Sequence, residues 1–322
     1  MSMMPQSATE RKRAPTPSSW FDDTPVLGRL PPDKAAARLR ELGEDAAAAQ
    51  LEQAGAGDVA AKGLFDIEWP FQDRAWQHTA HAFGYIPAAA PGAGPVAITF
   101  AGNLTADEAL RGARIKITLH ALRVADYPGG GEHRILFDFY AQNQAAEGVE
   151  DLHFNATYRA QEGEKAATVG FPLFTGLNVG KEGLTLRCYT VNVQNKGDQA
   201  FLDMLESDVF KAGLKLATTV QPAIAPLSAL ALGVTKAVAE RNQNVPVQDF
   251  ALGLDFGNTP GGARLAQGTY LAVQIPESMT TAWNWNEWVY DPSNGQVVNK
   301  ADATQLIPYN YIMFGISKYD ES

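Results

Sequence analysis

Three tryptophans stand within six positions in the segment WNWNEWVYDP, residues 283–292. On an extended strand the first two would point to one face, and the asparagine that follows each of them would point to the other. Such an aromatic face is typical of a protein core, of a protein interface or of a platform that stacks on a sugar, and we keep these alternatives open in that order. The candidate binding residues of this segment are Trp283, Asn284, Trp285, Asn286 and Trp288.

Histidines are the next candidates, because His78 and His81 lie three residues apart. On one helical turn they could share a metal ion, but a zinc site needs three or four ligands. The chain has no HExxH motif and only one cysteine, so we predict ordinary surface or boundary histidines and no metal. His120 and His153 fall on the polar positions of predicted strands, so we expect both to face solvent.

The sequence contains no G-x-S-x-G elbow and no GxxxxGK[ST] phosphate loop. Cys188 falls on an apolar strand position, which favours a buried side chain over a reactive thiol. Asp249 and Asp255 share a strand face but lie about 20 Å apart along the strand, whereas glycosidase carboxylates stand roughly 5–9.5 Å apart. We therefore predict no catalytic residue and no cofactor, and we favour a protein that is not an enzyme.

The chain has 322 residues, 45% of them hydrophobic, and a formal net charge of −10. Phosphate contacts need a positive surface, so the acidic balance argues against a nucleic-acid partner. The single cysteine excludes an internal disulfide and fits a reducing compartment. The first residues carry no apolar run of the kind that a signal peptide needs, and we expect a cytoplasmic protein.

From about residue 95, apolar and polar residues alternate with a period of two. About ten such runs are separated by turns rich in Gly, Asn and Pro, such as DYPGGGEH and DFGNTPGG. Alternation on this scale indicates antiparallel sheets with one buried face each. We therefore predict a mainly β protein, a two-sheet antiparallel β-sandwich. Clear apolar positions are Ile115, Ile117 and Leu119, then Ile135, Phe137 and Phe139, and then Leu184, Leu186 and Cys188.

Two stretches have helical patterns instead. Residues 30–57 open with Pro-Pro-Asp, are interrupted by Gly43 and end in glycines, which predicts a short helical hairpin. An Ala-rich stretch near 200–243, broken by Pro222 and Pro226, predicts a helical excursion from the sandwich. We divide the chain into a disordered tail at 1–25, the hairpin at 26–63, and the sandwich at 64–322 with the excursion inserted.

Acidic residues follow predicted strands at Asp126, Asp198 and Asp203, where loops could bind ions or partners. The strand–acidic loop–strand segments 115–141 and 184–204 resemble C2 domains, which are eight-stranded β-sandwiches whose loops bind calcium, phospholipid or protein. GDQAFLD resembles that family's D-D-F-L-G turn, whereas GGGEH stands where the family has S-D-P-Y. Most calcium-ligand aspartates have no counterpart. The resemblance therefore implies a calcium-independent sandwich that binds protein.

These observations favour a non-catalytic binding, adaptor or regulatory protein that acts through protein–protein contacts, so we expect a protein partner. Two alternatives stay open. Residues 216–235 carry no charge, and a helix of that length would reach about 30 Å, enough for a bilayer. Helices within 209–240 could therefore associate with a membrane or a pore. The three tryptophans could instead serve a carbohydrate-binding module.

Overall fold

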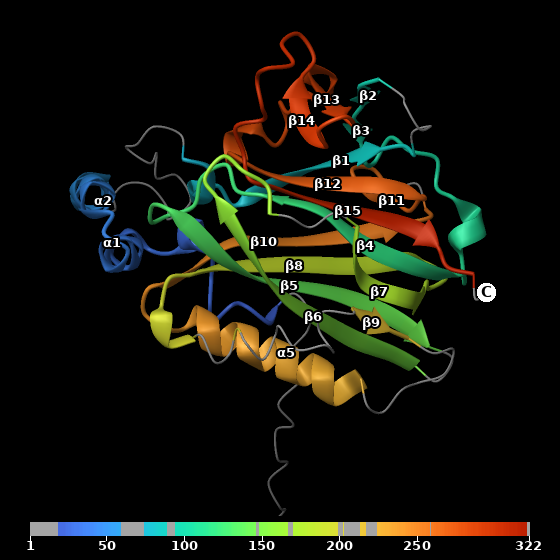
Figure 1. Ribbon diagram of the computed structural model, residues 1–322, viewed down its shortest axis with the longest axis horizontal. Helices are drawn as coiled ribbons and strands as arrows, with labels where there is room; N and C mark the ends of the chain where they lie inside the picture. Colours follow the sequence, from blue (N-terminus) through green and yellow to red (C-terminus); the bar gives the residue numbers. More distant parts are fainter. Residues whose placement is uncertain are drawn as a thin grey trace, which may run out of the picture.

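Two large β-sheets and one small sheet make up most of the structure, which is a computed structural model of the chain (Figure 1). The protein is mainly β, as the alternating sequence pattern predicts. The described residues are 19–58, 74–88, 94–145, 148–166, 170–198, 202, 213–216, 224–257 and 259–320.

The first large sheet has seven strands in the order β3-β1-β12-β15-β4-β7-β9. Neighbours pair antiparallel, except β7 and β9, which are parallel. The strands are β1 (Ala80–Ile86), β3 (Thr99–Phe100), β4 (Arg114–Arg123), β7 (Phe171–Asn178), β9 (Leu214–Lys215), β12 (Gly268–Ile275) and β15 (Tyr311–Lys318).

The second large sheet has five strands in the order β11-β10-β8-β5-β6. They also pair antiparallel, except β10 and β11. The strands are β5 (Glu132–Ala145), β6 (Gly148–Gln161), β8 (Gly183–Val193), β10 (Asn244–Asp255) and β11 (Ala263–Arg264).

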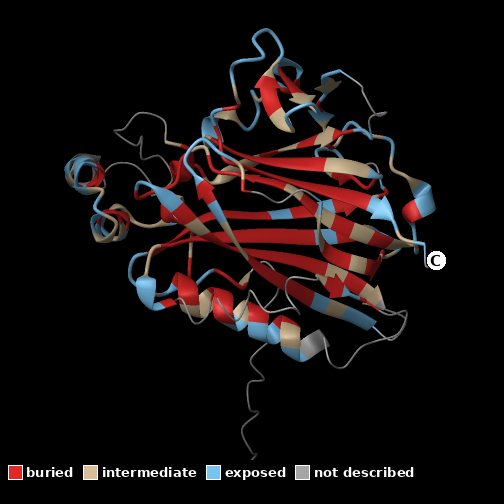
Figure 2. Cartoon of the chain, viewed as in Figure 1, coloured by how far each residue is buried: buried red, intermediate tan, exposed pale blue. Residues whose placement is uncertain are grey.

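The two large sheets share one apolar core, and most of their strands are coloured as buried in Figure 2. Phe139 of β5 meets Phe314 of β15 there, with ring centroids 5.4 Å apart. The alternation predicted for residues 135–139 therefore matches the face that points inward. Cys188 of β8 is fully buried in this core, and burial raises the pKa of its thiol. The prediction of a buried cysteine is confirmed.

Helix α5 (Ile224–Ala239) covers the outer face of the five-stranded sheet, chiefly over β6 (Figure 1). Beneath it, Asp138 Oδ1 lies 2.8 Å from His153 Nδ1, and Thr235 of α5 donates to Asp138 Oδ2 at 2.7 Å. Asn155 donates to the Thr235 hydroxyl at 2.8 Å. His153 is only 3% exposed. The expectation that His153 faces solvent is therefore wrong, because a helix covers the polar face of its strand.

α5 is 16 residues long and is the main described part of the excursion predicted near 200–243. β9 falls in the same stretch, and most of residues 199–223 lie outside the described ones. Measured against the thickness of a bilayer, none of the described helices is both long and apolar enough to cross it.

The predicted helical hairpin consists of α1 (Pro32–Glu41) and α2 (Asp45–Asp58), which lie at one end of the sheets (Figure 1). Pro32 stands at the start of α1, as expected. Gly43 turns the chain between the helices with a φ of 78°, a conformation that favours glycine. Arg38 donates to the carbonyl of Arg241 at 3.0 Å, which joins the hairpin to the chain between α5 and β10.

Residues 19–26, which we call the strap, lie against the outer face of the five-stranded sheet. We predicted a disordered tail at 1–25, of which residues 1–18 lie outside the described ones. For residues 19–25 the prediction is wrong, because Trp20 and Phe21 are 5% and 3% exposed. The polar composition of the segment masked these two aromatic anchors.

A third sheet, which the sequence analysis did not anticipate, packs on the outer face of the seven-stranded sheet. Its order is β14-β13-β2, and it stands apart at the top of Figure 1. Its strands are β2 (Val96–Ala97), β13 (Trp288–Asp291) and β14 (Gln296–Asn299). Short 3-10 helices complete the described chain: η2 (Leu27–Arg29), η3 (Ala75–Gln77), η4 (Glu108–Leu110), η5 (Lys196–Asp198), η6 (Glu277–Met279) and η7 (Trp285–Glu287).

The hydroxyl of Thr235 satisfies both Asp138 and Asn155, which gives a first prediction. Thr235→Val keeps the shape but leaves these buried polar groups short of a partner, so we expect the free energy of unfolding to fall by about 1–3 kcal/mol. Urea unfolding followed by circular dichroism measures this loss. Thr235→Ser keeps the hydroxyl and serves as the matched control. Equal stability of the Val and Ser variants would contradict the assignment.

Candidate binding surface

The tryptophan segment begins as a helical turn and not as a strand. η7 covers Trp285–Glu287, and the strand β13 starts only at Trp288. Asn284 caps this turn: its side chain accepts from the backbone N–H of Asn286 at 3.1 Å and donates to Glu287 at 2.9 Å. The expected division into one aromatic face and one amide face is therefore wrong, because the cap replaces the extended backbone.

Two of the three tryptophans lie in the interior. Trp285 and Trp288 are 7% and 8% exposed and belong to the core between the small sheet and the seven-stranded sheet. Trp285 lies flush against β1, where a Cβ on Gly84 would approach the indole to 2.8 Å. Glycine is required here because no side chain fits beneath the ring. Trp285 thus fixes the small sheet to the large one.

Trp283 reaches the surface. Its ring is half-buried, stacked 6.3 Å from Trp288 and set edge-on 5.5 Å from Trp285. Tyr309 packs 5.8 Å away on a further side. Around it, residues 280–282 and the side chains of both asparagines are exposed. We call residues 280–287 the crest: one partly exposed indole on a rigid aromatic base, with a polar rim.

Two of the three predicted loop acids, Asp126 and Asp198, are paired with arginines. Asp126 accepts from Arg74 at 2.6 and 2.8 Å, and the side-chain hydrogen bond to Asp126 raises the pKa of Arg74. Asp198 is fully buried and pairs with Arg241 at 2.5 Å. Asp203 lies outside the described residues. These bonds hold the loops in place, and the role of the three acids in binding stays a prediction.

His78 and His81 contact different layers of the molecule. The His78 ring lies 5.5 Å from Tyr309, in the layer under the small sheet. The His81 ring lies 5.1 Å from Phe250, toward the five-stranded sheet. Their segment is extended here, so the helical turn that would let them share a metal is not formed. Within the described ranges no three His, Cys, Asp or Glu side chains gather around a possible metal ion.

A buried ion pair on the outer face of the five-stranded sheet escaped the sequence analysis. Arg187 Nε and Nη2 lie 2.9 and 3.0 Å from the two oxygens of Asp249, and Arg29 adds a third bond at 3.0 Å. Arg187 and Asp249 stand on the polar positions of β8 and β10. Polar residues at alternate strand positions are also typical of a face covered by water. The sequence pattern therefore could not predict the Arg187–Asp249 pair.

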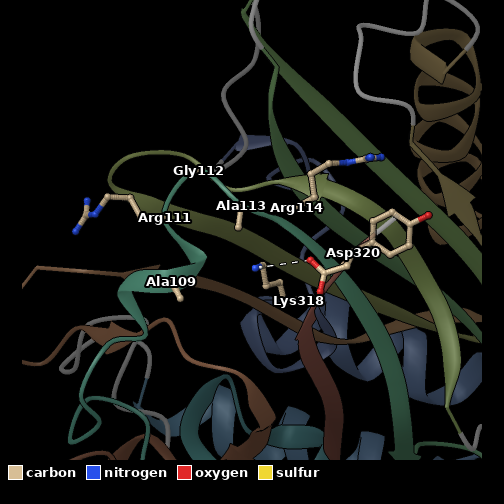
Figure 3. A pocket seen from close by; sticks show the side chains of 8 residues that line it. Ala109, Arg111, Gly112, Ala113, Arg114, Lys318 and Asp320 are labelled. Atoms are coloured by element: carbon tan, nitrogen blue, oxygen red, sulfur yellow. Dashed lines mark ion pairs between the residues drawn. The ribbon is translucent and has the colours of Figure 1, made fainter. Parts of the chain in front are cut away.

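A shallow hollow lies beside the start of β4 and the end of β15 (Figure 3). Its charged groups are engaged: Arg111 pairs with Glu108 at 2.9 Å, and Arg114 donates to the Leu216 carbonyl at 2.6 Å. Lys318 lies 3.7 Å from Asp320, the contact dashed in Figure 3.

Trp285 and Trp283 give a matched pair of substitutions. Trp285→Ala removes a buried ring from the junction of two sheets, so we expect the free energy of unfolding to fall by about 3–5 kcal/mol. Trp283→Ala removes a half-buried ring and should cost clearly less. Urea unfolding of both variants measures the difference. A Trp285 variant as stable as the Trp283 variant would contradict the assignment of Trp285 to the core.

His81 predicts a pH dependence. Burial lowers its pKa to about 3, and Arg29 adds to this effect while Asp249 opposes it. Because the side chain titrates near 6.5 when unfolded, the unfolded chain binds a proton between about pH 6.5 and pH 3 that the folded chain does not. Stability therefore falls as the pH falls through this window. His81→Gln should flatten the fall in urea unfolding at pH 6.5 to 4, and an unchanged slope would refute this origin.

Comparison of the chain with known proteins finds no protein-family model, no curated protein and no solved structure that matches it. The functional argument therefore depends on the geometry of the chain's own residues.

Proposed function

We propose that this protein is a non-catalytic binding protein, an adaptor or regulator that contacts a protein partner through the crest. The observation that supports the proposal is Trp283, a half-buried indole surrounded by exposed polar side chains. Tryptophan is among the residues that contribute most to binding at interfaces, where a polar rim around it excludes water. The crest has this arrangement.

The rigidity of the crest also supports a binding role. Trp283 rests on Trp288 and Tyr309, and the turn beside it is capped by Asn284. Trp283 therefore has little conformational freedom to lose when a partner binds, which lowers the entropic cost of association. The C2-like arrangement inferred from the sequence stays part of this proposal. Arginine partners at Asp126 and Asp198 fit a sandwich that does not depend on calcium.

The two alternatives have less support. A carbohydrate platform would use the faces of several tryptophans, but Trp285 and Trp288 are buried. Membrane or pore association would use helices within 209–240, but α5 packs its Ala231, Val234 and Val238 side chains against the sheet. A cytoplasmic location stays a prediction from the sequence.

Trp283→Ala tests the proposal. We expect it to weaken capture of the partner from native lysate by about 2 kcal/mol or more, roughly thirtyfold, while the protein stays folded. Tyr319→Ala is the matched control, because Tyr319 is also a half-buried aromatic residue. It follows the end of β15, and the chain end there lies away from the small sheet in Figure 1. The readout is the quantity of each co-purifying protein by mass spectrometry. Equal recovery of every partner by the Trp283 and Tyr319 variants would overturn the proposal.

A further inference from the structure

The strap is attached to the five-stranded sheet mainly through two neighbouring aromatic rings. Trp20 lies 4.5 Å from Tyr140, edge-on, and 4.5 Å from His153. Phe21 stacks on Tyr189 with ring centroids 3.9 Å apart and planes 7° from parallel. The backbone bonds of the strap close its own turns, from Asp22 N–H to the Ser19 carbonyl and from Thr24 N–H to the Phe21 carbonyl. The strap is thus a compact turn seated on the sheet and not one of its strands.

The floor beneath the strap is held by its own polar pairs. Tyr140 donates to Asp151 at 2.6 Å, and His153 pairs with Asp138. Arg187, whose guanidinium lies 5.0 Å over the Phe21 ring, is fixed by Asp249. Because these pairs do not involve the strap, the floor would keep its shape without it. A purely apolar surface would rearrange when a segment packed on it is removed, because packing contacts alone orient its side chains.

Buried polar atoms stay unsatisfied at the strap, among them the Thr24 hydroxyl of the strap itself and a nitrogen of the floor. His153 Nε2 has no hydrogen-bond partner among the described residues, although it is shielded from solvent. A buried nitrogen without a partner costs free energy, and the ring that carries it packs against Trp20. The strap therefore fills the site incompletely, whereas a ligand with a hydroxyl or amide at this point would satisfy the nitrogen.

Asp23, the second residue after the aromatic pair, pairs with a lysine of α5. Lys236 of α5 lies 3.0 and 2.9 Å from the two oxygens of Asp23, and Tyr189 donates to the carbonyl of Thr24. The features that the site recognises are thus two adjacent aromatic rings, then a carboxylate, then a backbone carbonyl. All four are properties of a short peptide.

We propose that this site, the strap groove, docks an aromatic–aromatic–acidic segment of another protein, and that the strap occupies it in cis. The groove is defined by Tyr140, His153, Arg187, Tyr189 and Lys236. The strap continues directly into η2, so it competes within the same molecule and a partner must displace it. This inference uses none of the residues of the crest and stands or falls apart from it.

The test removes the two aromatic rings from the groove and offers the segment in trans. Trp20→Ala/Phe21→Ala is made in the full chain, and binding of a fluorescein-labelled peptide SWFDDTPVL (residues 19–27) is followed by anisotropy. We expect saturable binding to the double variant and at least tenfold weaker binding to the wild type. The same peptide with alanine at both aromatic positions is the control and should not bind. A folded double variant that ignores the native peptide, or binds both peptides alike, overturns the proposal.

Two further measurements cover other results. If the double variant is unfolded, the native peptide should restore a cooperative melting transition, because a ligand that binds only the folded state stabilises it. Failure to restore this transition overturns the proposal.

In the folded double variant, Lys236→Glu should weaken binding of the peptide about two- to fivefold, as expected for an exposed ion pair. A peptide carrying lysine at the Asp23 position should recover that loss. No response to either charge change would refute the acidic part of the assignment.

Discussion

A carboxylate buried in a sheet constrains much of this structure. Asp138 lies near the middle of β5 with 1% of its surface exposed, and an ionised carboxylate in such a place is costly unless it is fully hydrogen-bonded. His153 from the neighbouring strand and Thr235 from α5 supply the bonds. To bring Thr235 to Asp138, α5 must therefore have one rotation about its own axis and one position along β6. The five-stranded sheet thereby acquires two covered faces, an apolar one inside and one of mixed polar and apolar residues outside.

Both faces of this sheet are covered, which limits the surfaces on which the proposed partner could bind. The inner faces of the two large sheets are used by the shared core, and α5 and the strap occupy the outer face of the five-stranded sheet. The small sheet occupies part of the outer face of the other large sheet. The crest lies on top of that last layer. The proposed strap groove differs from the crest, because a segment of the chain itself already fills it.

The strands of the two large sheets could be predicted because their inward positions are apolar in strict alternation, as at Phe137 and Phe139. The outer face of the five-stranded sheet could not, because polar residues such as His153 alternate in the same way whether water or a helix covers them. The turn at Trp285 left a usable signal: Asn284 and Glu287 have the spacing of a capping box. The small sheet left little sequence signal, because its strand β2 has only two residues. The aromatic pair of the strap was hidden by its polar surroundings.

The cysteine buried between the two large sheets can be used to measure how often these sheets separate. Cys188 has no exposed surface, and its thiol is kept protonated by burial. A thiol-reactive dye can modify it only in molecules whose two large sheets have separated. The rate of labelling in native buffer would therefore report how often the two large sheets separate, and no engineered probe is needed. Movements confined to the strap or the crest would not change this rate.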